Sequence, residues 1–347
     1  MIKEMYYLPT SFIFFGYAFF TLLYIIRKRE EKIQKHLFVN ELLIVLLFIN
    51  AGIMFPFMYQ FNSPLLSKDT LNFLWFLSSL FFLIEMGVWA ITLIYNYVIS
   101  KKNPVIMGER DYKKYCDKFI ENWTDDLKSE FGRKMLHLFT SAVIFFFWTI
   151  GGLLENYGIL EQFGLDIYSF SYWWIITIGF AFVFMFQIAD LARLNRFYML
   201  PNWAKFWFLS MRKEELDTFI GSTPLVLSFV PFIFAPFPIF AAVALITTGA
   251  DAIACLIGKK FGKYNLKKDS KKTIEGFIGG GISTFLIVII IMILYNNWIS
   301  IDLIKIILMA IIAMIIFLLI DFYTVNISDN ILNPIFTGLA MWVIFLI

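Results

Sequence analysis

The feature that most constrains this fold is a series of apolar runs, each about as long as a bilayer is thick. A helix needs about 20 apolar residues to span the hydrocarbon core. Because a spanning segment must satisfy its backbone hydrogen bonds internally, helices are expected throughout. We therefore predict an all-α, polytopic integral membrane protein with about ten transmembrane helices, near residues 6–26, 37–58, 71–98, 135–153, 171–189, 219–235, 237–257, 275–295, 302–320 and 328–347.

The composition agrees with a chain that is dissolved in lipid. Only 16% of the residues are charged, against about 25% in soluble domains. The net charge of +3 is small, so no nucleic-acid partner is indicated and the bilayer is the expected partner. Cys116 and Cys255 are too few for a disulfide framework or a zinc site.

The basic residues predict an orientation. Of the 29 lysines and arginines, 26 lie in the loops after the first, third, fifth and seventh spans. Positive charge is retained on the cytoplasmic side, so these basic loops are predicted to be cytoplasmic and both termini extracytoplasmic. This alternation assumes that Ala235, Pro236 and Pro238 form a tight turn between two full spans. The membrane would be the cell membrane or, in a eukaryote, the endoplasmic reticulum.

Three regions are expected along the chain. Residues 1–99 form an amino-terminal three-span region of unknown role, and residues 100–130 form a charged cytoplasmic linker. Residues 131–347 form the catalytic membrane domain. Within it, residues 199–217 mix aromatic and basic residues in the way typical of an amphipathic helix at the interface.

Acidic side chains mark the cytoplasmic ends of several spans. Asp251 lies inside an apolar run, where an ionised carboxylate is costly and functional by default. Asp190, Asp321 and Asp329 lie near the ends of three other spans, so every notable intramembrane polar group is predicted on one side. Magnesium takes oxygen ligands and bridges to substrate phosphates, and we predict Mg²⁺ at Asp251, Asp329 and Asp321. Each acid could instead cap a helix.

A lysine-rich loop follows Asp251. Seven lysines fall between Lys259 and Lys272, and a helix start with exposed amides follows at Thr273. Ammonium groups and helix amides together bind anions, so a nucleotide phosphate site is predicted. Its residues are Lys260, Lys263, Lys271, Lys272, Glu275 and Gly276. The alternatives are that the lysines only set topology and that Gly276 and Gly280 only allow close helix packing.

A second polar motif opens the fourth span. Glu130, Arg133, Lys134 and His137 recur at helical spacings of three and four, so most share one face. Lys134 could serve topology alone. His137 could act as a general base or could bond a neighbouring carbonyl group.

These segments, in this order, resemble the CTP-dependent lipid kinases. The matching motifs are E-x-x-R-K-x-x-H from Glu130, D-x-x-R from Asp190, G-A-D-A from Gly249, G-K-K-F-G-K from Gly258, K-K-T-I-E-G from Lys271 and D-N-x-x-x-P from Asp329. The chain is similar over residues 130–347 to the dolichol kinase, phytol kinase and CTP-dependent diacylglycerol kinase group. That group is related to the phosphatidate cytidylyltransferases.

The resemblance implies transfer of the γ-phosphoryl group of CTP to the hydroxyl of a membrane lipid alcohol. It implies catalytic roles for Asp251, His137, Arg133 and Asp190, with Mg²⁺ on the nucleotide and the site facing the cytoplasm. One alternative is a cytidylyltransferase that makes a CDP-lipid. Another is a transporter or scaffold that is not an enzyme.

Overall fold

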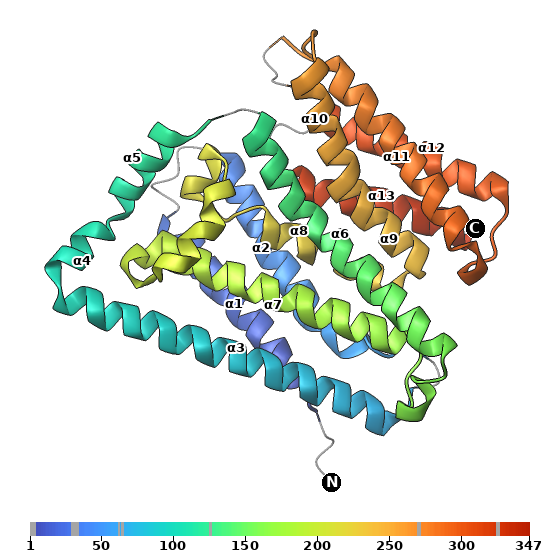
Figure 1. Cartoon of the computed structure of the whole chain (residues 1–347), viewed down its shortest axis with the longest axis horizontal. Helices are drawn as coiled ribbons and strands as arrows, with labels where there is room; N and C mark the ends of the chain where they lie inside the picture. Colours follow the sequence, from blue (N-terminus) through green and yellow to red (C-terminus); the bar gives the residue numbers. More distant parts are fainter. Residues whose placement is uncertain are drawn as a thin grey trace. The chain divides into compact units, whose positions relative to one another are not determined.

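The computed structural model of this chain describes residues 5–28, 35–61, 63, 66–124, 127–268, 272–323 and 327–347. Within this part the regular structure is helical, and the β pairing is one isolated bridge between Asn265 and Thr273. The α-helices of Figure 1 are α1 Leu8–Lys28, α2 Lys35–Met54, α3 Lys68–Lys102, α4 Pro104–Glu109, α5 Tyr112–Asn122, α6 Leu127–Asn156, α7 Ile167–Arg196, α8 Ser222–Leu227, α9 Phe237–Leu245, α10 Asp251–Phe261, α11 Ile274–Leu294, α12 Leu303–Tyr323 and α13 Asp329–Leu346.

The helix lengths confirm a polytopic membrane protein. In the described part of the chain, nine helices are long and apolar enough to cross a bilayer. They correspond to nine of the ten expected spans. One of them joins α9, the turn Ile246–Ala250 and α10 into a single helix over Phe237–Phe261.

The expected sixth span, residues 219–235, is different. This segment forms the six-residue helix α8 and a 3-10 helix over Val230–Phe234, so it is not one continuous spanning helix. Pro231 explains the break, because it lacks the amide proton that would bond the Leu227 carbonyl group if α8 continued. Irregular backbone at membrane depth must be covered by protein, and most residues of this segment are buried. The number of crossings and the orientation remain predictions.

The chain divides into two compact units. The first unit comprises residues 1–124, 163–165 and 176–227, and the second comprises residues 125–162, 166–175 and 228–347. Helix α7 contributes to both units. The charged linker contains two helices, α4 and α5.

Aromatic and hydroxyl contacts hold α1 against α7 and α3 in the first unit. Phe14 of α1 packs edge-on against Phe180 and Phe184 of α7, with ring centroids 4.7 and 4.8 Å apart. Thr10 of α1 and Ser79 of α3 share a hydrogen bond of 2.8 Å. Such bonds satisfy hydroxyl groups that lipid could not solvate.

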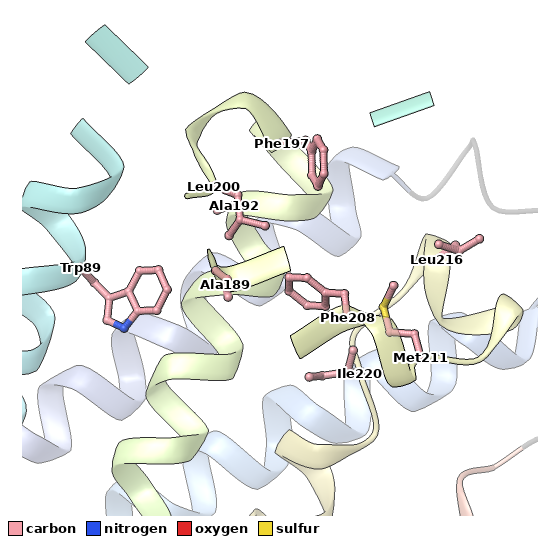
Figure 2. Close-up of a cluster of buried hydrophobic side chains, with 10 residues drawn as sticks. Trp89, Ala189, Ala192, Phe197, Leu200, Phe208, Met211, Leu216 and Ile220 are labelled. Atoms are coloured by element: carbon pink, nitrogen blue, oxygen red, sulfur yellow. The ribbon is translucent and has the colours of Figure 1, made fainter. Parts of the chain in front are cut away.

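The segment after α7 folds back onto the same unit. Its side chains form a buried cluster with small residues of α7 and with one tryptophan of α3 (Figure 2). The members are Trp89, Ala189, Ala192, Phe197, Leu200, Ala204, Phe208, Met211, Leu216 and Ile220. The segment consists of 3-10 helices, of which Asn202–Ser210 is the longest, rather than the single amphipathic helix expected over 199–217. Phe208 is fully buried, while Phe206 is 71% exposed, so the segment still has an apolar exposed side.

The second unit is a bundle of α6 and α9 to α13. Helix α10 packs closely on α11, and α11 on α12 (Figure 1). At the other end of the bundle, Trp148 of α6 stacks on Phe237 of α9 with 3.5 Å between ring centroids. These contacts place the polar start of α6 beside α10.

Glycine allows the close approach of α10 and α11. A Cβ atom on Gly276 would lie 2.6 Å from the carbonyl oxygen of Ala254 and 3.0 Å from the Cα of Gly258. Both contacts are with backbone, which cannot rotate away. The helix-packing alternative for Gly276 therefore has direct geometric support.

We expect Gly276→Ala to destabilise the protein by about 1–3 kcal/mol, because the new methyl group must push α10 away from α11. Thermal unfolding of the purified protein in detergent measures this change. Gly87→Ala is the matched control, since a Cβ there meets nothing within 4 Å and alanine favours the helix. Equal unfolding temperatures for the two variants would contradict the packing role.

Candidate active site

Asp251 follows a π-helical turn in the middle of a long helix. The turn Ile246–Ala250 is fully buried, and Thr247 and Thr248 donate hydrogen bonds of 2.8 Å to the carbonyl groups of Val243 and Ala244. Single π turns inside α-helices occur often at functional sites. This turn sets the rotation at which α10 begins, and so the direction in which Asp251 projects.

A polar seam joins α6 to this helix. Lys134 of α6 forms an ion pair with Asp251, and one helical turn away Cys255 lies 3.5 Å from the Glu130 carboxylate. Further along, Ser141 shares a hydrogen bond of 2.6 Å with Thr248. The two helices run antiparallel, so residues at spacings of about four on each helix meet in sequence.

Glu130, in the first turn of α6, supplies a negative charge to two neighbouring cations. Its carboxylate accepts a hydrogen bond of 2.5 Å from Arg133 and lies 3.9 Å from the Lys259 ammonium group. Arg133, a predicted catalytic residue, is therefore held by Glu130 at the entrance to α6. Side chains of both residues are about nine-tenths buried, with 12% and 11% exposure.

His137 lies one helical turn further into α6 and is 7% exposed. Its Nδ1 atom is buried and has no hydrogen-bond partner. The ring is close enough to interact electrostatically with Lys134, Asp251 and Asp329. The alternative in which His137 bonds a neighbouring carbonyl through Nδ1 is therefore not what the structure has.

The three acids predicted to bind Mg²⁺ all belong to the second unit. Asp321 interacts electrostatically with Asp251 and Asp329, but its Oδ1 accepts a hydrogen bond of 2.6 Å from Lys272. Within the described residues, no group of three or more His, Cys, Asp or Glu side chains is arranged to hold a metal ion. A magnesium ion held by these acids remains a prediction.

The lysines of the loop after α10 divide into two groups. Lys260 and Lys263 are exposed and form no ion pair with any described residue. Lys272, by contrast, bonds both Asp321 Oδ1 and the Asp321 carbonyl oxygen, and Lys267 donates to the Phe322 carbonyl group at 2.5 Å. The second group holds the carboxyl end of α12, where the helix dipole attracts cations.

The start of α11 closes this loop. Glu275 accepts a hydrogen bond of 3.0 Å from the Lys263 amide, and the Thr273 hydroxyl caps the helix by accepting from the Gly276 amide at 3.2 Å. Glu275 and Gly276 therefore shape the loop that carries Lys263. Lys271, also predicted at the phosphate site, lies outside the described residues.

Asp190 belongs to the first unit. Its Oδ1 accepts from Arg193 Nε and Nη2 at 2.9 and 2.7 Å, and its Oδ2 accepts from the Ile220 amide at 2.8 Å. Arg193 also donates to the carbonyl groups of Leu216 and Thr218. Both side chains are fully buried. These bonds fasten the segment before α8, and a catalytic role for Asp190 remains a prediction.

Sequence reasoning missed Glu85 and did not foresee the contacts of Glu130. Glu85 lies halfway along α3 and has a buried Oε2 without a hydrogen-bond partner, which is an exception to the rule that polar groups gather at one end of the spans. Glu130 was recognised only as part of a motif, although it bridges α6 and α10. Glu85 could have been found from its place in the apolar run Phe81–Trp89.

The described residues thus form apolar helices, and in the second unit acids, lysines and a histidine gather where α6 meets α10. A model of the Cytidylyltransferase family matches residues 118–342, so the chain belongs to that family. No curated protein and no solved structure matches the chain. The match confirms the resemblance at the level of the wider family and makes CTP a plausible substrate; it does not separate kinases from cytidylyltransferases.

Proposed function

We propose that this protein is a CTP-dependent lipid kinase. It would transfer the γ-phosphoryl group of CTP to the hydroxyl of a membrane isoprenoid alcohol of the dolichol, polyprenol or phytol type, or of a diacylglycerol. Membership of a CTP-utilising family supports the nucleotide. The observation that favours an alcohol acceptor is the buried, unpartnered Nδ1 of His137 beside the Lys134–Asp251 ion pair.

The two possible acceptors differ in whether a proton must be removed from the attacking oxygen. A lipid hydroxyl must lose its proton as it attacks phosphorus, and a positioned side chain commonly accepts it. A lipid phosphate, the acceptor of a cytidylyltransferase, is already ionised and needs no base. An imidazole with a buried, unpartnered Nδ1 near the Lys134–Asp251 ion pair suits the first reaction.

Nucleotide binding is assigned to the second unit. Asp251, with Asp329, would hold Mg²⁺, and Lys260 and Lys263 would contact the phosphates. One or two carboxylates are what Mg²⁺ takes from protein when phosphates and water supply its remaining ligands, so the donor set fits although no larger acid cluster is seen among the described residues. Bound there, the ion would neutralise charge on the nucleotide phosphates.

In the proposed phosphoryl transfer, one bond to phosphorus forms and one breaks. The acceptor oxygen bonds to the γ-phosphorus while the bond from that phosphorus to the bridging oxygen of CDP breaks. The hydroxyl proton passes to His137 Nδ1, and Arg133 and the lysines neutralise the phosphoryl oxygens. The lipid chain stays in the bilayer, so only its head group reaches the site, which would face the cytoplasm.

We expect His137→Gln to lower turnover about a hundredfold with little change in nucleotide affinity, because it removes the proton acceptor and leaves the phosphate ligands. Initial rates with saturating CTP and lipid extract measure turnover, and Trp fluorescence titration measures affinity. An unchanged rate would favour a phosphate acceptor, for which no base is required.

The by-product separates the two enzymatic proposals. Purified protein, Mg²⁺, CTP and a total lipid extract are incubated, and soluble nucleotides are resolved by ion-exchange chromatography. A kinase releases CDP and no pyrophosphate, whereas a cytidylyltransferase releases pyrophosphate and no CDP. Release of neither, in a protein that binds CTP, would support a transporter or scaffold.

A further inference from the structure

The ion pair between Lys134 and Asp251 creates a conflict with metal binding. The Lys134 side chain is 3% exposed and the Asp251 side chain 19% exposed, and the ammonium group bonds Asp251 Oδ2. A lysine in this position repels a divalent cation that approaches the same carboxylate. Asp251 therefore has one counterion in the structure and needs another for the proposed reaction.

We propose that Lys134 is a resident counterion that the metal–nucleotide complex displaces. Lys134 neutralises Asp251 while the site is empty of nucleotide, which avoids a bare carboxylate within the membrane. When the cation binds Asp251, the ammonium group is released and moves to a phosphate oxygen of the nucleotide. This inference rests on the proposed function, because it needs a divalent cation at Asp251.

The surroundings of Lys134 support this exchange. The nearest acid one turn away on α6 is Glu130, whose carboxylate already faces Arg133 at 2.5 Å and Lys259 at 3.9 Å. Arg133 and Lys259 already neutralise Glu130, so Glu130 would attract a released Lys134 ammonium group only weakly. A phosphate of the incoming nucleotide is the better partner. The lysine side chain has a flexible four-carbon stem, so its ammonium group can move while α6 stays in place.

The exchange distinguishes Lys134 from a lysine with a purely structural role. If the two cations compete, removal of the ammonium group should strengthen metal binding even though it weakens catalysis. A structural lysine would show the opposite, because its loss would disorder Asp251. We thus expect Lys134→Met to bind Mn²⁺ roughly tenfold more tightly than the wild type, while its turnover falls.

The test is a titration of Mn²⁺ without nucleotide, followed by electron paramagnetic resonance of the free ion in purified, detergent-solubilised protein. The proteins are wild type, Lys134→Met, Lys134→Arg, Asp251→Asn and the control Lys305→Met, which removes a lysine near the start of α12. Lys134→Arg keeps the competing charge, so its affinity should stay near that of the wild type. Lys305→Met should match the wild type as well.

The outcomes separate this inference from the proposed function. Equal or weaker Mn²⁺ binding by Lys134→Met, with binding lost in Asp251→Asn, would overturn the exchange and leave the metal site intact. Unchanged binding in Asp251→Asn would contradict the metal site itself.

Stability of the variant gives a second readout. Since Mn²⁺ replaces the missing counterion, it should raise the unfolding temperature of Lys134→Met by more than that of the wild type. A Lys134→Met protein that is unfolded with and without saturating Mn²⁺ would also overturn the exchange, because the ion would then not substitute for the lysine.

Discussion

Replacement of Asp251 by asparagine is expected to lower CTP-dependent transfer to lipid by roughly a thousandfold. The amide cannot hold a divalent cation on the nucleotide as a carboxylate does. It also leaves Lys134 as a buried cation without its partner, and breaking a buried ion pair destabilises a protein by about 3–5 kcal/mol. Loss of activity alone would therefore not separate chemistry from folding.

The double variant Asp251→Asn/Lys134→Met separates the two effects. It removes both members of the pair, so its unfolding temperature should recover toward the wild-type value, as expected for coupled residues. Its transfer rate should stay about a thousandfold low. A double variant that recovers activity together with stability would show that Asp251 serves the fold only.

The second large effect is expected in the first unit. Arg193→Met should destabilise the protein by about 3–5 kcal/mol, because it leaves the buried Asp190 carboxylate without a cation. It also removes the donor for the carbonyl groups of Leu216 and Thr218. Asp190 and Arg193 are 0% exposed as side chains, so water cannot take over these bonds.

Thermal unfolding in detergent measures this loss as a lower apparent unfolding temperature. Arg196→Met is the matched control, because Arg196 lies one turn further along α7 and is exposed. We expect the control to unfold as the wild type does. If Arg193→Met were as stable as Arg196→Met, the hydrogen bonds from Arg193 to the segment before α8 would contribute nothing to stability.

Most of the fold could be predicted because hydrophobicity acts over whole segments. Nine long apolar helices among the described residues correspond to predicted spans, and their lengths follow from the bilayer thickness. The prediction of a spanning helix over 219–235 was wrong because mean hydropathy takes no account of where proline interrupts the backbone hydrogen bonds. Pro231, visible in the sequence, is what breaks it.

The residues of the candidate site could be predicted from the sequence, but the contacts between them could not. Asp251 and His137 stand out because polar groups inside apolar helices are rarely accidental. That Lys134 contacts Asp251 could not be foreseen, since no periodicity specifies which helix faces which. The π turn before Asp251 further changes the direction of that side chain in a way no regular helix pattern predicts.

The lysine loop shows a similar division. Its positive charge is evident from sequence, but Lys272 and Lys267 bind the end of α12, whereas Lys260 and Lys263 are exposed. Topology and phosphate binding both predict lysines there. Only the three-dimensional contacts distinguish lysines that hold a helix end from lysines that are available to a nucleotide.

The most direct test of the kinase proposal uses CTP labelled separately at the α- and γ-phosphorus. Purified protein with Mg²⁺ receives a mixed lipid extract, with and without prior phosphatase treatment. We predict that γ-label enters lipid and that phosphatase treatment does not diminish it, because the acceptor is an alcohol. Label from the α-position in lipid, lost after phosphatase treatment, would contradict the proposal and assign the protein to CDP-lipid synthesis.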